Sequence, residues 1–163
     1  IITLEIIRES KKLLPISLLF LALVIILAFK SVVPFLISFS RIIISIVVTI
    51  ASMVIFDVPM RIGTSFIPIL LLATGSSYST HFLTVFYDNY RNKKQPIEIA
   101  LKNTIYHNFS PLFLAWFTTA IGYFSLIFSD IKSVIEFGVF NTIGVNVAGI
   151  LSLFLVPSIL LLV

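Results

Sequence analysis

Long apolar stretches separated by short polar segments make up most of the chain. Five of them approach the length of about 20 largely apolar residues that a membrane-spanning helix requires, and they cover residues 13–29, 33–56, 64–87, 109–128 and 134–163. A backbone inside lipid must satisfy its own hydrogen bonds, and the repeated short alternating segments of a β-barrel are not found in this sequence. The pattern predicts an all-α integral membrane protein, a bundle of five transmembrane helices.

The longest polar interruption, residues 88–108, has a helical pattern of its own. Ile97, Leu101 and Ile105 recur at a spacing of four and share one face of a helix. We therefore expect a helix over about 96–107 that lies on the membrane surface. A solvated loop is the alternative reading of the same residues.

Basic residues set the expected orientation of the bundle. The 88–108 segment carries Arg91, Lys93, Lys94 and Lys102, and short loops rich in Lys and Arg stay in the cytoplasm. Alternation places the turn at 30–33 on the same side, and the turns at 57–63 and 129–133 outside. Residues 1–12 then fall outside although they are basic, which fits a large translocated domain before them, because long domains cross largely regardless of charge.

The two ends of the sequence suggest that it is a piece of a longer chain. It begins without methionine and stops within an apolar run. We expect residues 1–12 to be the extracytoplasmic flank of a missing domain, and 13–163 to be the helix bundle.

Polar side chains interrupt the third apolar stretch in the octet GSSYSTHF, residues 75–82. On a helix Ser77, His81 and Thr84 form one stripe, with Tyr78 about 60° to the side of His81. We expect this stripe to face other helices, in a packed contact, a wet cavity or both. Ionisable residues inside a span often mark an ion or substrate path, so His81 is either such a group or a neutral partner of a neighbouring helix.

Arg41 interrupts the second apolar stretch on a stripe that also holds Ser38, Ser45 and Ser52. An arginine at the centre of a span costs about 2.5–3.5 kcal/mol on insertion scales. One interpretation places its charge in the headgroup region, because it lies two turns from the expected cytoplasmic end and a long side chain can reach that far. The other gives it a functional role inside the bundle.

Small and hydroxyl residues recur at helical spacing in the later stretches. Such residues allow helices to approach closely in lipid. We assign Gly75, Thr118, Thr119, Gly122, Ser125, Gly138 and Gly144 to helix packing.

Composition narrows the possible chemistry. The chain is 59% hydrophobic and 11% charged, whereas soluble domains average about 45–50% apolar and about 25% charged residues. Without cysteine and with two histidines, we expect no metal site and no cofactor. No HExxH, no G-x-S-x-G and no acidic partner for His81 occur within the spans, so we expect no enzyme. The net charge of +4 reflects topology rather than nucleic-acid binding.

The order of several motifs resembles one transporter superfamily. GSSYSTHF is similar to the mid-membrane Gly-x-Asp-Tyr-x-x-His/Phe motif of resistance–nodulation–division (RND) transporters, in the branch with MMPL-type lipid exporters, hydrophobe/amphiphile exporters and sterol-sensing domains. TTAIGYFSLIFS (118–129) resembles the Thr-Thr-x-x-Gly-Phe-x-Ser-Leu stretch of the next helix, and residues 137–160 resemble the Phe-Gly…Gly…Pro helix that follows. FIPILLLATG (66–75) and the 88–108 segment also fit.

The resemblance implies one six-helix transmembrane half without its first helix. It implies a multi-pass protein of the cell membrane, in prokaryotes the inner membrane, with a second half, extracytoplasmic domains, membrane lipids and a hydrophobic substrate as partners. The implied function is export of lipids or other hydrophobic or amphiphilic molecules, coupled to protons. The alternative is a sterol-sensing-like module that binds lipid without transport.

One departure from the family pattern concerns the proton carrier. Ser77 stands where the family has its intramembrane aspartate, Tyr78 matches the family tyrosine, and His81 matches the next polar position. Serine does not titrate, and some exporters of this branch carry the carboxylate in one half only. The resemblance implies Ser77, Tyr78 and His81 as relay candidates, with Arg41 as a further candidate within the spans.

Overall fold

The computed structural model describes residues 2–29, 33–61 and 63–162, with side chains from residue 15 onward apart from 28 and 162. Its main elements are five helices: α1 (Ile2–Phe29), α2 (Val33–Ile55), α3 (Ile67–Tyr87), α4 (Ile97–Phe124) and α5 (Lys132–Leu162). A 3-10 turn precedes α3 (Thr64–Phe66), a π turn follows it (Asp88–Asn92), and a second 3-10 turn extends α4 (Ser125–Phe128). Lys30, expected in the cytoplasmic turn, lies outside the described residues.

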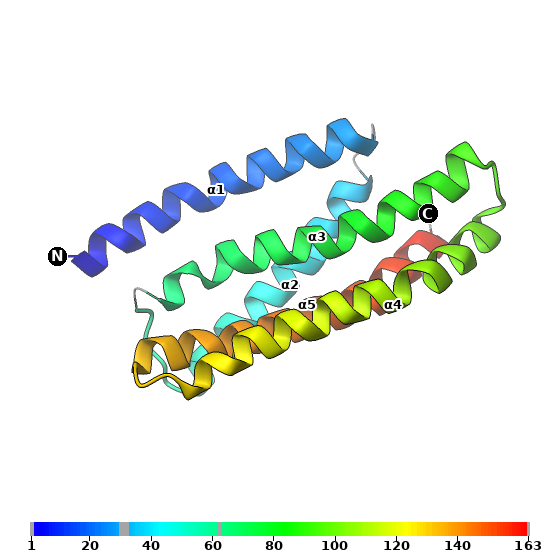
Figure 1. The fold of residues 1–163 in the computed structure, drawn as a ribbon. Coiled ribbons are helices and arrows are strands. Elements are labelled where there is room, and N and C mark those ends of the chain that lie inside the picture. The colour runs from blue at the N-terminus through cyan, green and yellow to red at the C-terminus, as the bar shows by residue number, and fades with distance from the viewer. Residues whose placement is uncertain (1, 30–32, 62, 163) are drawn as a thin grey trace.

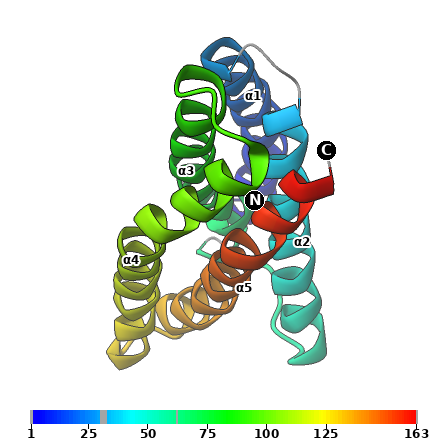
Figure 2. The same ribbon diagram turned by 90° about the vertical axis from the view of Figure 1, so that its right-hand side faces the viewer.

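The helices run roughly along one common direction (Figure 1). α2, α3, α4 and α5 form a bundle, in which α5 packs against each of the other three, and α1 packs on the outside against α3 and α2 (Figure 2). Within the described residues, four segments are long and apolar enough to cross a membrane: 33–55, 64–92, 97–128 and 132–161. The shorter apolar stretch Pro15–Leu27 lies in α1. The predicted all-α membrane architecture is confirmed.

Two helices begin or end differently from the prediction. α1 starts at Ile2, so the expected flank 2–12 continues the first helix. The expected surface helix over 96–107 is the first part of α4, because nothing between Ile97 and Phe124 ends the helix. Thr104, Asn108 and Leu112 continue one buried face at a spacing of four, so the helix packs on its neighbours from its start, while Ile105 of the expected apolar face is 40% exposed.

The end of α2 shows how the chain closes a helix without glycine. Asp57 adopts a left-handed backbone with φ 53°, a conformation that Asp tolerates better than most residues. The Val58 N–H donates to the Met53 carbonyl at 2.9 Å and the Asp57 N–H to the Val54 carbonyl at 3.1 Å. This pair of bonds is a Schellman motif, which satisfies carbonyls that a helix end leaves unpaired.

Glycines of α5 lie at the tightest helix crossings. A Cβ built on Gly144 would lie 2.6 Å from Thr49 Oγ1 of α2 and 2.6 Å from Leu71 Cδ1 of α3, and one on Gly138 would lie 2.7 Å from Leu126 Cβ. Gly149, which the sequence analysis did not single out, presses against the Trp116 ring. These contacts are the close approach that small residues permit in lipid.

The positions of α4 that were predicted to pack against other helices are mostly exposed. A Cβ on Gly122 would meet nothing within 4 Å, and Thr118 and Ser125 are exposed, while Thr119 is half-buried. Their shared face points away from the neighbouring helices of this segment, because α4 packs through the face that carries Leu112 and Ala120.

Two apolar clusters occupy the two ends of the bundle. One includes Ile37, Phe82 and Val156, and the other includes Met53, Leu71 and Val145. On α2, α3 and α5, the residues between these clusters include buried polar side chains. That layer holds the candidate site.

Candidate functional site

Arg41 is the centre of the polar layer. Its side chain is fully buried. Nη1 donates to the Ala148 carbonyl of α5 at 2.9 Å, and Nη2 donates to the Gly75 carbonyl and to Ser79 Oγ of α3, the latter at 2.5 Å. One guanidinium therefore joins three helices, and its planar array of five donors suits several fixed acceptors at once.

This geometry does not agree with the interpretation that places the charge of Arg41 in the headgroup region. The side chain does not extend along the membrane to the headgroup region, because its donors are engaged by helices α3 and α5 within the bundle. A second hydrogen bond supports the same helix contact, since Ser45 donates to the Gly144 carbonyl at 2.7 Å. Ser38, Ser45 and Thr49 of the same helix face are also buried.

No acidic side chain of the described residues pairs with Arg41. The ion pairs that join described residues lie at the two ends of the bundle: Arg61–Glu136 at 3.3 Å, Lys132–Glu136 at 4.0 Å and Lys93–Asp88 at 3.2 Å. The charge of Arg41 is instead stabilised by carbonyl dipoles and one hydroxyl. Hydrogen bonds to a charged group are stronger than neutral ones, and stronger still in a low dielectric. Carbonyl groups can therefore take the place of an acidic partner here.

The polar octet of α3 divides between two faces. Gly75, Tyr78 and Ser79 are buried, whereas Ser77 and His81 are exposed. Of the expected Ser77–His81–Thr84 stripe, Ser77 and His81 line a groove beside α4, whereas Thr84 is exposed and does not line it. The contact with α2 lies on the opposite side of α3, because Gly75 and Ser79 form the surface that receives Arg41.

Most hydroxyls of α3 have partners in their own helix. Thr74 donates to the Leu70 carbonyl, Ser76 to Ala73, Thr80 to Ser76 and Thr84 to Thr80, all at 2.7–2.9 Å. Such bonds to preceding carbonyls satisfy a hydroxyl in lipid without a partner helix. These hydroxyls therefore need neither water nor another helix.

A groove between α3 and α4 brings the relay candidates together. It has a volume of about 250 Å³ and is lined by Ser77, Tyr78, His81, Asn108, Pro111, Leu112 and Ala115. The Tyr78 hydroxyl and Asn108 Nδ2 are buried and have no hydrogen-bond partner among the described residues. Buried polar groups in proteins are nearly always satisfied, so both atoms need a partner that the described part of this segment does not supply in its present arrangement.

Thr119 lies near the buried Tyr78 hydroxyl. It approaches that hydroxyl as a side-chain hydrogen-bond partner, and its own hydroxyl donates to the Ala115 carbonyl at 2.7 Å. The Thr119 position, assigned to packing from the sequence, therefore lies beside the groove.

Asn108 is the groove residue that sequence reasoning missed. It falls at the end of the polar 88–108 segment, where an asparagine does not stand out from its neighbours. Its place in the groove becomes visible only because α4 runs through this position as one continuous helix. The signal in the sequence is Pro111, three residues on, which also lines the groove. A proline inside a helix removes one backbone hydrogen bond, and the released carbonyl belongs to His107.

The site offers no arrangement for metal chemistry among its described residues. No three His, Cys, Asp or Glu side chains in the described part of the chain gather closely enough to hold an ion. His81 and His107 lie on different helices, and His107 is exposed and in edge contact with the Tyr106 ring at 5.9 Å.

The fold and the buried charged layer define a multi-pass α-helical membrane protein. The chain belongs to the MMPL family, whose sequence model matches residues 4–163. It is similar to the putative membrane protein MJ1562 of Methanocaldococcus jannaschii, with 21% identity over 159 residues, 97% of this chain and 41% of the relative. The chain thus spans less than half the length of that relative.

Proposed function

We propose that this chain is a transmembrane segment of an RND-type exporter that moves lipids or other hydrophobic or amphiphilic molecules across or out of the membrane. Membership of the MMPL family and the RND-like order of its motifs support the class. The observation that carries the proposal is the groove, where Ser77 and His81 lie beside two unsatisfied polar atoms, the Tyr78 hydroxyl and Asn108 Nδ2. We further propose that the role is transport rather than catalysis.

Proton coupling in this segment is assigned to His81 and Tyr78. Histidine changes charge near neutral pH, and its exposed position at the groove gives it access to water or to another part of the protein. Ser77 and Asn108 hold ordered water between the titrating groups in this proposal. Arg41 organises the polar layer behind the groove through its bonds to α3 and α5, and it relays no proton, because a guanidinium keeps its protons in proteins.

The test is export by the full-length protein in vesicles with an imposed proton gradient. His81→Ala and Tyr78→Phe are expected to reduce gradient-driven export at least about a hundredfold, the lower end of the usual range for loss of a positioned acid or base. His107→Ala is the matched control, because it removes the other histidine, which is exposed and does not line the groove. Equal export by the His81→Ala and His107→Ala proteins contradicts the relay.

A lipid-binding module without transport is the second candidate. It is favoured by Ser77, which places a non-titrating residue at the position of the family aspartate. In that case the purified protein retains lipid, while an imposed proton gradient causes no export.

A further inference from the structure

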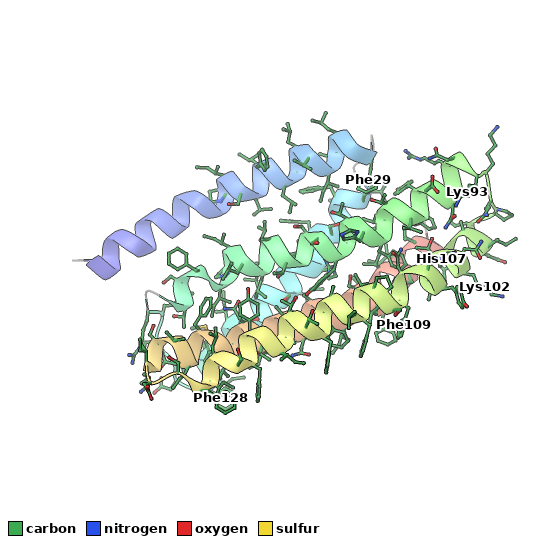
Figure 3. The ribbon with its side chains drawn as sticks, in the orientation of Figure 1. Phe29, Lys93, Lys102, His107, Phe109 and Phe128 are labelled. Carbon is green, nitrogen blue, oxygen red and sulfur yellow. The ribbon has the colours of Figure 1, made fainter. Side chains whose placement is uncertain are left out.

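Four helices meet at one end of the bundle around a small pocket. This end carries Phe29, Lys93 and Lys102 (Figure 3), and the sequence orientation places it in the cytoplasm. The pocket has a volume of about 220 Å³ and is lined by Val33, Phe86, Tyr87, Tyr90, Arg91, Ile97 and Leu160. Its wall therefore combines the start of α2, the end of α3 with its π turn, the start of α4 and the end of α5.

Arg91 holds its position at the mouth of this pocket through two contacts. Nη1 donates to the Phe29 carbonyl at the end of α1, at 3.0 Å, and the guanidinium carbon lies 4.5 Å from the centre of the Tyr87 ring. A cation at a helix C-terminus is favoured by the helix dipole. The side chain remains exposed, and a guanidinium has five N–H donors, so it can bind a further acceptor without leaving either contact.

The basic residues near Arg91 are not equally available to a ligand. Lys93 pairs with Asp88 at 3.2 Å and donates to Asn89 Oδ1 at 2.9 Å, so its charge is largely compensated. Lys94 is exposed and sits at a left-handed backbone position, φ 51°. Lys94 does not line the pocket, so Arg91 supplies the positive charge at its mouth, beside the apolar wall.

We propose that this pocket binds an anionic phospholipid of the adjacent leaflet. The phosphate is bound by Arg91, and the upper part of an acyl chain lies against Val33, Ile97 and Leu160. Clusters of Lys and Arg beside a cytoplasmic membrane surface attract anionic headgroups. The tyrosines Tyr87 and Tyr90 match the headgroup level at which aromatic side chains of membrane proteins gather.

The pocket wall argues for a lipid rather than a free phosphate. Val33, Phe86, Ile97 and Leu160 are apolar and lie next to the cation, so they suit a molecule with a charged head and an apolar tail. The proposed site lies at a helix end, away from the groove between α3 and α4. It does not depend on the exporter mechanism.

The test is native mass spectrometry of the purified full-length protein, with phosphatidylglycerol and phosphatidylcholine offered in equal amounts. The unmodified protein is expected to retain phosphatidylglycerol preferentially, and excess inorganic phosphate is expected not to displace it. Each cation near a membrane surface corresponds to about a fivefold change in affinity. Arg91→Gln should therefore lower retention about fivefold, whereas Arg91→Lys, which keeps the positive charge, should lower it less.

Two comparisons keep the result decisive. Lys102→Gln removes the same charge at the same end of the bundle but does not line the pocket, and it should retain phosphatidylglycerol as the unmodified protein does. Arg91→Lys guards against misfolding of the Arg91→Gln variant, because it keeps the positive charge that binds the phosphate and should restore most of the retention. Equal retention of the two lipids, an equal loss in the Arg91→Gln and Lys102→Gln variants, or displacement by inorganic phosphate would overturn the proposal.

Discussion

Arg41 and Ser79 face each other across the contact between α2 and α3, with Nη2 2.5 Å from the serine oxygen. The same nitrogen donates to the carbonyl of Gly75, one turn earlier on the same helix. Glycine allows the close approach there, because a Cβ at position 75 would lie 3.0 Å from Ile42 Cγ1 and would push that side chain aside. The two helices therefore approach through a glycine and bond through an arginine.

Replacement of Arg41 by lysine should destabilise the bundle. A lysine ammonium keeps the charge but lacks the planar array that reaches α3 and α5 together, so we expect a loss of about 1–3 kcal/mol, as for hydrogen bonds to a charged group. Unfolding of the purified protein in detergent measures it. Arg61→Lys, whose parent side chain is 42% exposed and paired with Glu136, is the control and should change stability by less than about 1 kcal/mol; similar losses in both variants contradict the central role of Arg41.

The substitution Gly144→Ala should lower the stability of the protein, and Gly122→Ala should not. The new methyl at 144 would lie 2.6 Å from both Thr49 Oγ1 and Leu71 Cδ1, while the methyl at 122 would meet nothing within 4 Å. Overpacking of this kind costs about 1–3 kcal/mol, whereas Gly→Ala in an open helix position gains up to about 1 kcal/mol. Thermal denaturation of the two variants tests the pair, and a reversal of their order would contradict the α2–α5 crossing.

The turn before α3 should cross-link to the start of α5. A Cβ on Gly63 would lie 3.0 Å from Ser133 Oγ, which is close to the geometry of a disulfide. Because the chain has no cysteine, the double variant Gly63→Cys/Ser133→Cys should form one defined bridge on mild oxidation, visible as a shift in electrophoretic mobility after cleavage between the two positions. Gly122→Cys/Ser133→Cys should form none, and equal cross-linking of both pairs would show that the turn does not pack on α5.

The groove between α3 and α4 should admit water. His81→Cys and Ser77→Cys are expected to react with a polar thiol reagent in intact membranes, because only the hydrated thiolate reacts readily and both positions line the groove. Phe82→Cys is the matched control, since Phe82 is buried at 2% exposure. The mass of each variant after treatment shows whether its cysteine has reacted. Absence of reaction at both groove positions would mean that this face lies in lipid.

The helices could be predicted because each long apolar run allows no other backbone in lipid. The face that each helix buries was harder to predict, and α3 shows why. Its octet is polar all round, so hydroxyl periodicity cannot distinguish the Gly75–Ser79 face, which binds Arg41, from the Ser77–His81 face, which is open.

Asn108 and Gly122 of α4 also show that the sequence pattern does not identify which face of a helix is buried. Asn108 is buried although it lies in a polar stretch, and Gly122 is open although its spacing resembles a packing motif. Contacts between helices depend on how each helix is rotated about its own axis. The spacing of residues within one helix does not determine that rotation. Arg41 was identified from the sequence, but its partners at Gly75, Ser79 and Ala148 follow only from the packing.

The acceptors of Arg41 are made long after the arginine itself. Gly75 follows it by 34 residues and Ala148 by 107 residues. At a synthesis rate of about 5–20 residues per second, the second interval corresponds to about 5–20 s. During biogenesis α2 must therefore hold an unpartnered positive charge at the insertion machinery or near the headgroups, and it can settle at its final depth only after α5 has been delivered.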